Sequence, residues 1–385
     1  MGKILVFAAL LLAVLCGLLF LLYYGYLKRL YLCLRHHKAF GKDTVGILFP
    51  ALTGREKVPL CIFAFVLALC SVNVLHMSGL FLLHLAAFAA LMQLLYKLVG
   101  KKLPSAAVLL HWCGILPLLL SALVMALGYA NLHHVTATEY TVYTDKPIRK
   151  EGYTAVLIAD MHYGVSLDDA ELAGICAGIG HLDADAVLLC GDIVDDQTPK
   201  ESLAPLFETL GSIPCKDGVY YVFGNHDRPF SHGGSSYTES DLRSALRHAG
   251  ITVLQDSCVL PGSDIALLGR EDRGHARQTL NELFSSADID PQRFVILLDH
   301  QPNDYEKAAH YADLILSGHT HGGQIFPLGP LMRLFGINDW VYGEKALDEN
   351  TTAIVTGGFA GWRFPIKTNA PAEYVVIRIL PTQHP

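Results

Sequence analysis

Long apolar runs dominate the first third of the chain, at residues 4–24, 59–74, 80–98 and 106–129. Because a helix of about 20 residues crosses a bilayer, these runs predict four transmembrane helices. The second run is the shortest, and only a few residues around His76 and Gly79 separate it from the third, which indicates a tight helical hairpin. The first run exceeds the roughly 7–15 apolar residues of a signal peptide, which favours a retained helix over a cleaved leader.

The pattern changes after the fourth run. Residues 132–150 are polar and rich in Thr and Tyr, and the alternating stretch EYTVYT at 139–144 predicts a first strand. We therefore expect a transmembrane region over residues 1–131, a connecting segment with that strand over 132–150, and a second domain over 151–385.

Short apolar runs in the second domain each lead into a cluster of residues that can bind metal. Five such runs are TAVLIADMH (154–162), DAVLLCGDIVDD (185–196), GVYYVFGNHD (218–227), FVILLDHQP (294–302) and DLILSGHTHGG (313–323). Helical stretches are expected at 202–210, 240–249 and 304–309. Strands alternating with helices indicate an α/β domain, in which sites form beyond the carboxyl ends of the strands.

Charge separates the two parts of the chain. Residues 1–134 hold eleven of the 29 Lys and Arg but two of the 36 Asp and Glu, a net charge of +9 against −16 for the remainder. An acidic domain argues against nucleic acid as its main partner, because phosphate backbones require clustered Lys and Arg. The nine cysteines show no zinc-binding spacing, and a Cys215–Cys258 disulfide stays possible.

Each polar cluster is weak evidence alone, but their order along the chain is specific. Residues 135–385 resemble the calcineurin-like metallophosphoesterases, and in detail the membrane-attached branch with a transmembrane region. The matching residues are Asp160-Met-His162, Gly191-Asp-Ile-Val-Asp195, Gly224-Asn-His-Asp227, His300 and Gly318-His-Thr-His321-Gly-Gly. The resemblance implies an αββα sandwich and a centre of two divalent metal ions.

The resemblance also implies a role for each matching residue. One ion would be held by Asp160, His162, Asp192 and His321, and the second by Asp192, Asn225, His300 and His319. This mixture of nitrogen and oxygen ligands suits Mn, Fe or Zn better than Mg or Ca. His226 would donate a proton to the leaving oxygen while Asp195 orients its ring; alternatively, His226 only caps its turn.

Phosphate recognition is less well defined. Some family members carry a phosphate-binding arginine at the position that Asp196 occupies here. Candidate substitutes are Arg228, Arg270 and Arg363, each of which could equally be an ordinary surface or structural arginine.

We therefore predict a membrane-anchored dinuclear-metal phosphohydrolase that cleaves a phosphodiester, phosphomonoester or pyrophosphate. Alternatives are a hydrolase specific for lipid-linked phosphates, as in some relatives, and a non-catalytic receptor or scaffold. The expected partners are the substrate and membrane lipids. Two loops, 25–58 and 97–105, carry ten Lys and Arg, against Lys3 on the opposite side. An excess of Lys and Arg marks cytoplasmic loops, so four spans would place the catalytic domain outside the cytoplasm.

Overall fold

The computed structural model describes residues 2–35, 52–73, 76–99, 111, 113–164, 166–228 and 235–382. The chain divides into two compact units, Met1–Leu127 and Gly128–Pro385.

The first unit is helical. Its helices are α1 (Gly2–Arg35), α2 (Gly54–Val72), α3 (Met77–Val99) and most of α5 (Ile115–Leu132), whose last turn belongs to the second unit. The Tyr23 hydroxyl of α1 lies 2.6 Å from Ser71 Oγ of α2 and donates to the Leu82 carbonyl of α3 at 2.6 Å. Buried alanines at 64, 68 and 86 let these helices approach closely, as small residues do between membrane helices.

The described helices differ in how well they are suited to cross a membrane. Among the described residues, three are long and apolar enough: Leu12–Arg35, Met77–Val99 and Ile115–Leu132. Helix α2 forms where the second span was predicted, but Arg55, Glu56 and Lys57 occupy its first turn and leave only 58–72 free of charge. Residue 74 of the second predicted span and residues 106–110 and 112 of the fourth lie outside the described residues.

The second unit contains two six-stranded sheets. The first has the order β1 (Thr136–Thr144), β12 (Glu373–Pro381), β2 (Tyr153–Ile158), β3 (Ala186–Cys190), β4 (Gly218–Val222), β5 (Thr252–Val253). The second has the order β10 (Gly343–Ala346), β11 (Thr352–Val355), β9 (Leu314–Ser317), β8 (Phe294–Leu298), β7 (Ile265–Gly269), β6 (Ser257–Val259). The helices are α6 (Asp169–Ile179), α7 (Leu203–Gly211), α8 (Glu239–His248), α9 (Leu280–Ala287), α10 (Tyr305–Ala308) and α11 (Leu328–Phe335), with short 3-10 turns η4 (Lys200–Ser202) and η5 (His321–Gly323).

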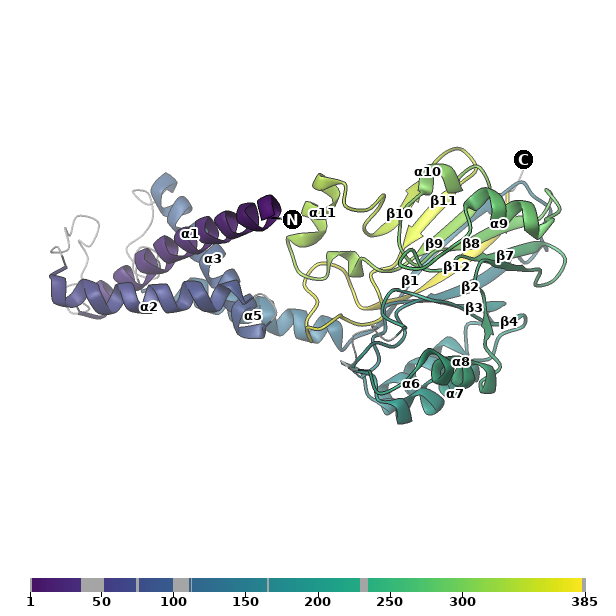
Figure 1. The fold of residues 1–385 in the computed structure, drawn as a ribbon, viewed down its shortest axis with the longest axis horizontal. Coiled ribbons are helices and arrows are strands. Elements are labelled where there is room, and N and C mark those ends of the chain that lie inside the picture. The colour runs from purple at the N-terminus through teal and green to yellow at the C-terminus, as the bar shows by residue number, and fades with distance from the viewer. Residues whose placement is uncertain are drawn as a thin grey trace. The chain divides into compact units, whose positions relative to one another are not determined.

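Alternating side chains build four layers from these elements. In β2, Val156 and Ile158 pack with α6 to α8, whereas Ala155 and Leu157 pack between the two sheets. Strand β8 likewise divides its side chains between the inter-sheet core and a third core shared with α9 and α10. Because successive side chains of a strand point to opposite faces, strands that are apolar throughout are buried on both faces. Figure 1 shows the resulting helix–sheet–sheet–helix arrangement, which confirms the predicted αββα sandwich.

The predicted strands are confirmed, and their directions bring the polar clusters together. Strands β2, β3 and β4 are parallel neighbours in one sheet, and β8 and β9 are parallel neighbours in the other. Their carboxyl ends therefore meet at one edge of the sandwich. The cysteine pairing that the sequence left open does not occur, since Cys215 and Cys258 are both free thiols.

Candidate metal centre

All seven predicted ligands lie just beyond the carboxyl ends of β2, β3, β4, β8 and β9. Two groups have ligand atoms within 4.8 Å of one another: Asp160 with His162 and His321, and Asp192 with His300 and His319. We call them the first and second ligand groups. Asn225 joins the second group, because its Oδ1 lies 2.8 Å from Nδ1 of His319. The structure therefore assembles the residues that the sequence pattern selected.

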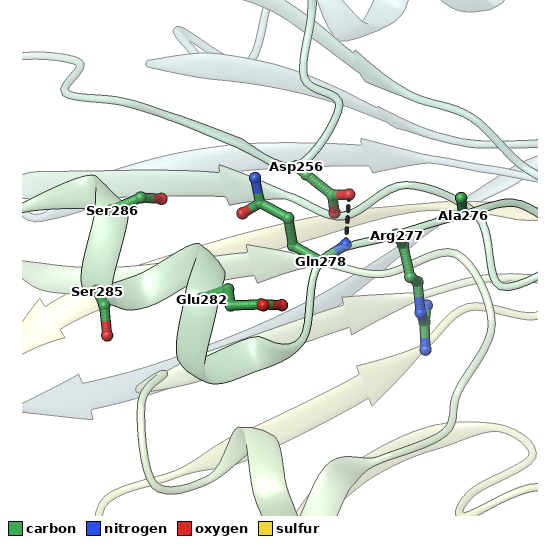
Figure 2. A pocket seen from close by; sticks show the side chains of 7 residues that line it. All are labelled: Asp256, Ala276, Arg277, Gln278, Glu282, Ser285 and Ser286. Atoms are coloured by element: carbon green, nitrogen blue, oxygen red, sulfur yellow. Dashed lines mark hydrogen bonds between the residues drawn. The ribbon is translucent and has the colours of Figure 1, made fainter.

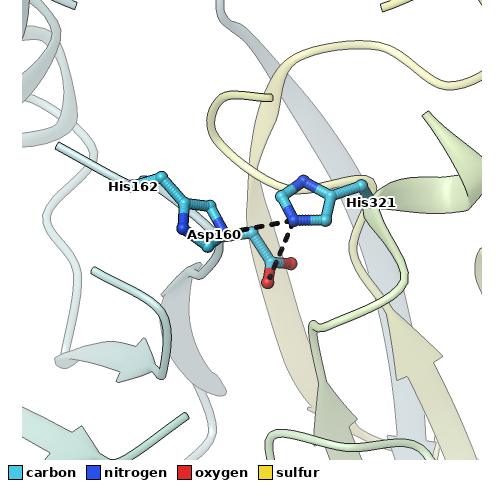
Figure 3. Close-up of side chains that lie close together, drawn as sticks. All are labelled: Asp160, His162 and His321. Carbon is cyan, nitrogen blue, oxygen red and sulfur yellow. Dashed lines mark hydrogen bonds and ion pairs between the residues drawn. The ribbon is translucent and has the colours of Figure 1, made fainter. Parts of the chain in front are cut away.

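The first ligand group is fully buried. His162 Nε2 and His321 Nε2 face each other at 3.2 Å, and His321 Nε2 lies 3.9 Å from Asp160 Oδ1 (Figure 3). His162 Nε2 also lies 3.8 Å from Asp192 Oδ2. Asp192 is thus close to both ligand groups.

The second ligand group is centred on Asp192. Its Oδ2 lies 3.1 Å from His300 Nε2, while His300 Nδ1 lies 2.8 Å from the Cys190 carbonyl oxygen. Burial raises the pKa of Asp160 to about 6, from an ordinary value of 3.8. Burial also acts on Asp192, but the charge and hydrogen bond of His300 outweigh it and hold the Asp192 pKa below its ordinary value. Asp192 is therefore the carboxylate whose charged form the neighbouring imidazole favours most.

The proton positions of the imidazoles test whether a cation fits the first group. Nδ1 of His162 lies 3.5 Å from Asp195 Oδ2, and Nδ1 of His321 lies 3.3 Å from the Ala360 carbonyl oxygen. Both neighbours are acceptors, so each neutral ring carries its proton on Nδ1. With the protons on Nδ1, the two Nε2 lone pairs converge across 3.2 Å, as the lone pairs of two nitrogens that bind one cation would. The donor set fits a divalent metal, with a nitrogen and oxygen mixture that favours Mn, Fe or Zn.

Backbone conformation concentrates strain at this edge. Asp160, His162, Asp192, His319 and His321 all have a positive φ, between 42° and 72°. Side chains other than glycine rarely adopt this region, and such residues gather at functional sites. The neighbouring Gly224 is also constrained, because a Cβ there would lie 2.2 Å from Asp192 Oδ1. The loops thus hold the ligands in positions that ordinary turns would not provide.

Asp227 is a backbone brace for the second group. Its buried carboxylate accepts hydrogen bonds from the amides of Asp192, Ile193, Val194 and Gly224 at 2.6–3.2 Å. These bonds tie the loop after β3 to the loop after β4.

His226 lies beside the ligands, and Asp195 lies next to one of them. The His226 ring is 5.2 Å from the ring of His162 and 5.2 Å from that of Trp362, measured between centroids. Its backbone amide donates to Asp192 Oδ1 at 2.7 Å. Asp195, however, forms its ion pair with His162. A carboxylate at this position fixes the tautomer and orientation of a metal-binding histidine.

Lys367 is a residue that sequence reasoning missed. Its fully buried ammonium donates to the carbonyl oxygens of Gly357 and Gly358, the latter at 2.8 Å. Ala360, two residues after Gly358, connects this segment to the first ligand group. Its amide donates to the Asp160 carbonyl, and its carbonyl oxygen faces Nδ1 of His321. Burial lowers the pKa of Lys367 to about 7. A single lysine in a polar stretch gives no sequence signal of burial, so only the structure reveals this clamp.

The three candidate arginines differ in their surroundings. Arg228 pairs with Glu271 at 2.6 Å, and Arg270 pairs with Asp299 at 2.8 Å, in both cases with buried carboxylates. Binding a phosphate would require these pairs to break. Arg363 is exposed and directly follows Trp362, the residue that contacts His226. Arg363 is therefore the candidate that we retain.

A hollow elsewhere in the second unit is not part of this centre. It has a volume of about 770 Å³ and is lined by Asp256, Ala276, Arg277, Gln278, Glu282, Ser285 and Ser286 (Figure 2). The Asp256 carboxylate accepts from the Gln278 amide at 2.8 Å and so serves the loop before α9. The lining residues do not include any of the seven ligands.

Comparison with known proteins agrees with this geometry. Residues 153–323 match the calcineurin-like phosphoesterase family. An uncharacterized metallophosphoesterase of Helicobacter pylori is 32% identical over 262 residues, which is 66% of this chain and 66% of that protein, just under two thirds of its length. A zebrafish transmembrane protein with metallophosphoesterase domain is 27% identical over 67% of this chain and 61% of its own.

Among solved structures, a dimetal phosphatase from zebrafish aligns with a TM-score of 0.36 and 12% identity, over 54% of this chain and 88% of that one. So remote a likeness carries no argument about function. The family match and the similarity to named metallophosphoesterases support one assignment: residues 153–323 belong to a domain of the calcineurin-like phosphoesterase family.

Proposed function

We propose that the chain is a membrane-anchored phosphohydrolase that uses two divalent transition-metal ions to cleave a phosphoester or pyrophosphate bond. The observation that carries this proposal is the position of Asp192, whose Oδ2 lies 3.1 Å from His300 of one ligand group and 3.8 Å from His162 of the other. One carboxylate can therefore serve both ions. When bound, such a pair activates water near neutral pH and offsets charge on the phosphoryl oxygens.

The protein side chains would divide the remaining work. Asp195 holds His162 with Nε2 toward the centre, and the Cys190 carbonyl does the same for His300. The ligands Asn225 and His319 are half-buried, as is the neighbouring His226, whereas the other five ligands are buried. Substrate would therefore enter from the side of the half-buried residues. His226 would give a proton to the leaving oxygen there. Arg363, exposed beside Trp362, would bind a non-reacting phosphate oxygen.

We further propose that the catalytic domain lies outside the cytoplasm. This requires α2 to cross the membrane together with α3. At about 1.5 Å per residue, the 19 residues of α2 extend roughly 28 Å, close to the thickness of the hydrocarbon core. Its charged first turn would then lie at the cytoplasmic surface. If α2 does not cross, the three remaining helices place the domain inside.

A reporter fused after Pro385 tests the orientation. Activity of an alkaline-phosphatase fusion supports an extracytoplasmic domain, because that enzyme matures only outside the cytoplasm. Fluorescence from a reporter that folds only in the cytoplasm, fused at the same site, would contradict it.

Hydrolysis tests the enzymatic proposal against a non-catalytic receptor or scaffold. The purified full chain, supplied with Mn, Fe or Zn, should hydrolyse a soluble aryl phosphodiester or phosphomonoester. The matched control is Asp192→Asn, purified in parallel, which should be inactive. Absence of turnover by the unaltered chain with all three metals would leave the receptor or scaffold as the better account.

A further inference from the structure

The segment that follows the metal-binding loop carries an uncovered apolar surface. Within residues 326–337, six large apolar side chains are 39–75% exposed: Phe326, Leu328, Leu331, Leu334, Phe335 and Ile337. Helix α11 occupies the middle of this segment, and Gly329 is its buried residue. We call residues 326–337 the apolar ridge. Contiguous exposed apolar patches of this kind mark interaction surfaces.

The ridge is fastened to the metal-binding loop. Gly323 ends the 3-10 turn that begins at His321, and a Cβ on Gly323 would lie 2.2 Å from Gly329 Cα. The two backbones touch because both residues are glycine. Asn369 donates to the Gly322 carbonyl, and the Phe326 amide donates to Thr368 Oγ1 at 2.9 Å. The position of the ridge is therefore set relative to the first ligand group.

Charge around the ridge distinguishes it from the rest of the domain. Residues 135–385 have a net charge of −16, yet residues 326–337 contain no Asp or Glu and a single cation, Arg333. Arg333 lies over the Trp340 ring at 4.6 Å, and Lys345 lies near the same ring at 5.1 Å. An anionic lipid surface repels an acidic domain but attracts Lys and Arg beside exposed Leu and Phe.

We propose that the apolar ridge inserts into the surface of the lipid bilayer that holds this chain, and thereby brings the metal centre to substrates embedded in that bilayer. Three helices of the same chain are suited to cross a membrane, so the domain is held close to lipid permanently. The substrate class that follows is a phosphoester or pyrophosphate with an apolar tail. This part rests on the proposed phosphohydrolase function, whereas insertion of the ridge does not.

Photocrosslinking in the full chain tests insertion directly. Phe335→p-benzoylphenylalanine places the probe on the ridge, and the chain is reconstituted in vesicles of phosphatidylcholine and phosphatidylglycerol. The matched control is Leu260→p-benzoylphenylalanine. Leu260 is apolar and 48% exposed, but it lies before β7, at the edge of the sandwich opposite the metal ligands.

After illumination, mass spectrometry should find phospholipid adducts at position 335 and far fewer at position 260. Adducts joining position 335 to peptides of this chain would overturn the proposal, since its own helices or a second copy would then cover the ridge. Equal lipid labelling at both positions would also overturn it.

Kinetics test the substrate class separately. The double variant Leu334→Asp with Phe335→Asp should slow hydrolysis of a lipid-tailed phosphodiester in the same vesicles by at least about tenfold, because charged side chains oppose insertion. Hydrolysis of a soluble aryl phosphodiester should not change, nor should either rate in Leu260→Asp. Equal slowing of both substrates would contradict the inference. Failure of the unaltered chain on both would instead refute the phosphohydrolase function.

Discussion

The two ligand groups are held in place by different means. In the first, ionisable side chains do much of the work: Asp195 pairs with His162, and Lys367 clamps the segment that reaches His321. In the second, neutral groups hold the rings, with the Cys190 carbonyl behind His300 and the Asn225 amide oxygen beside His319. All three residues of the first group are buried, whereas His319 of the second is half-buried. The second group is therefore the more accessible of the two, on the side from which the proposed substrate would enter.

The largest effect is expected from replacing the residue that the two ligand groups share. Asp192→Asn takes away the carboxylate near both His162 and His300. We expect loss of most bound metal and of nearly all activity, because both ions lose charge compensation together. Metal analysis and the aryl phosphodiester assay measure the two effects. Retained activity would mean that another residue bridges the ions.

His226→Gln should separate chemistry from metal binding on the open side. If His226 is the general acid, kcat falls by roughly 10²–10⁴ while metal content stays nearly unchanged. The loss should be smaller for esters with good leaving groups, which need no proton. An equal loss for aryl and alkyl esters would indicate a structural role.

Asp195→Asn should affect the first group selectively. The amide no longer stabilises the His162 tautomer with a negative charge, so metal affinity or activity should fall by about 10–100-fold. Titration of the chain with Mn should show one weakened site and one unchanged. The matched control is Asp196→Asn, the neighbouring half-exposed acid, which should leave both sites intact. Equal weakening of both sites would contradict the assignment of Asp195 to the first ligand group alone.

Lys367→Met should have the smallest effect of the four. The apolar replacement leaves the Gly357 and Gly358 carbonyls without their donor, a loss of about 1–3 kcal/mol when buried. We expect a lower melting temperature of the catalytic domain and a modest weakening of the first metal site only. Unchanged stability would mean that the clamp does not hold the loop.

The metal ligands could be predicted from sequence because each follows an apolar strand signal. A run such as AVLLC before Gly191-Asp192 predicts both a buried strand and the place where it ends. The partner of Asp195 could not be predicted in this way. The ion pair of Asp195 with His162 depends on the course of two loops that carry no periodic pattern.

Other features escaped prediction for a different reason. Lys367 has the residue type of a surface position, and its burial follows from carbonyls ten and nine residues earlier in the chain. The apolar ridge has the composition of a core segment, yet its side chains are exposed. Residue type predicts that a lysine is exposed and that a leucine or phenylalanine is buried. A buried lysine and exposed apolar side chains can therefore be found only in the structure.

The two ligand groups predict a centre of two metals, which the number of ions per chain measures. The purified full chain, loaded in turn with Mn, Fe or Zn and freed of loosely bound metal, should retain close to two ions per chain by inductively coupled plasma mass spectrometry. One ion or none with all three metals would contradict the account, since the two ligand groups would then not form two sites.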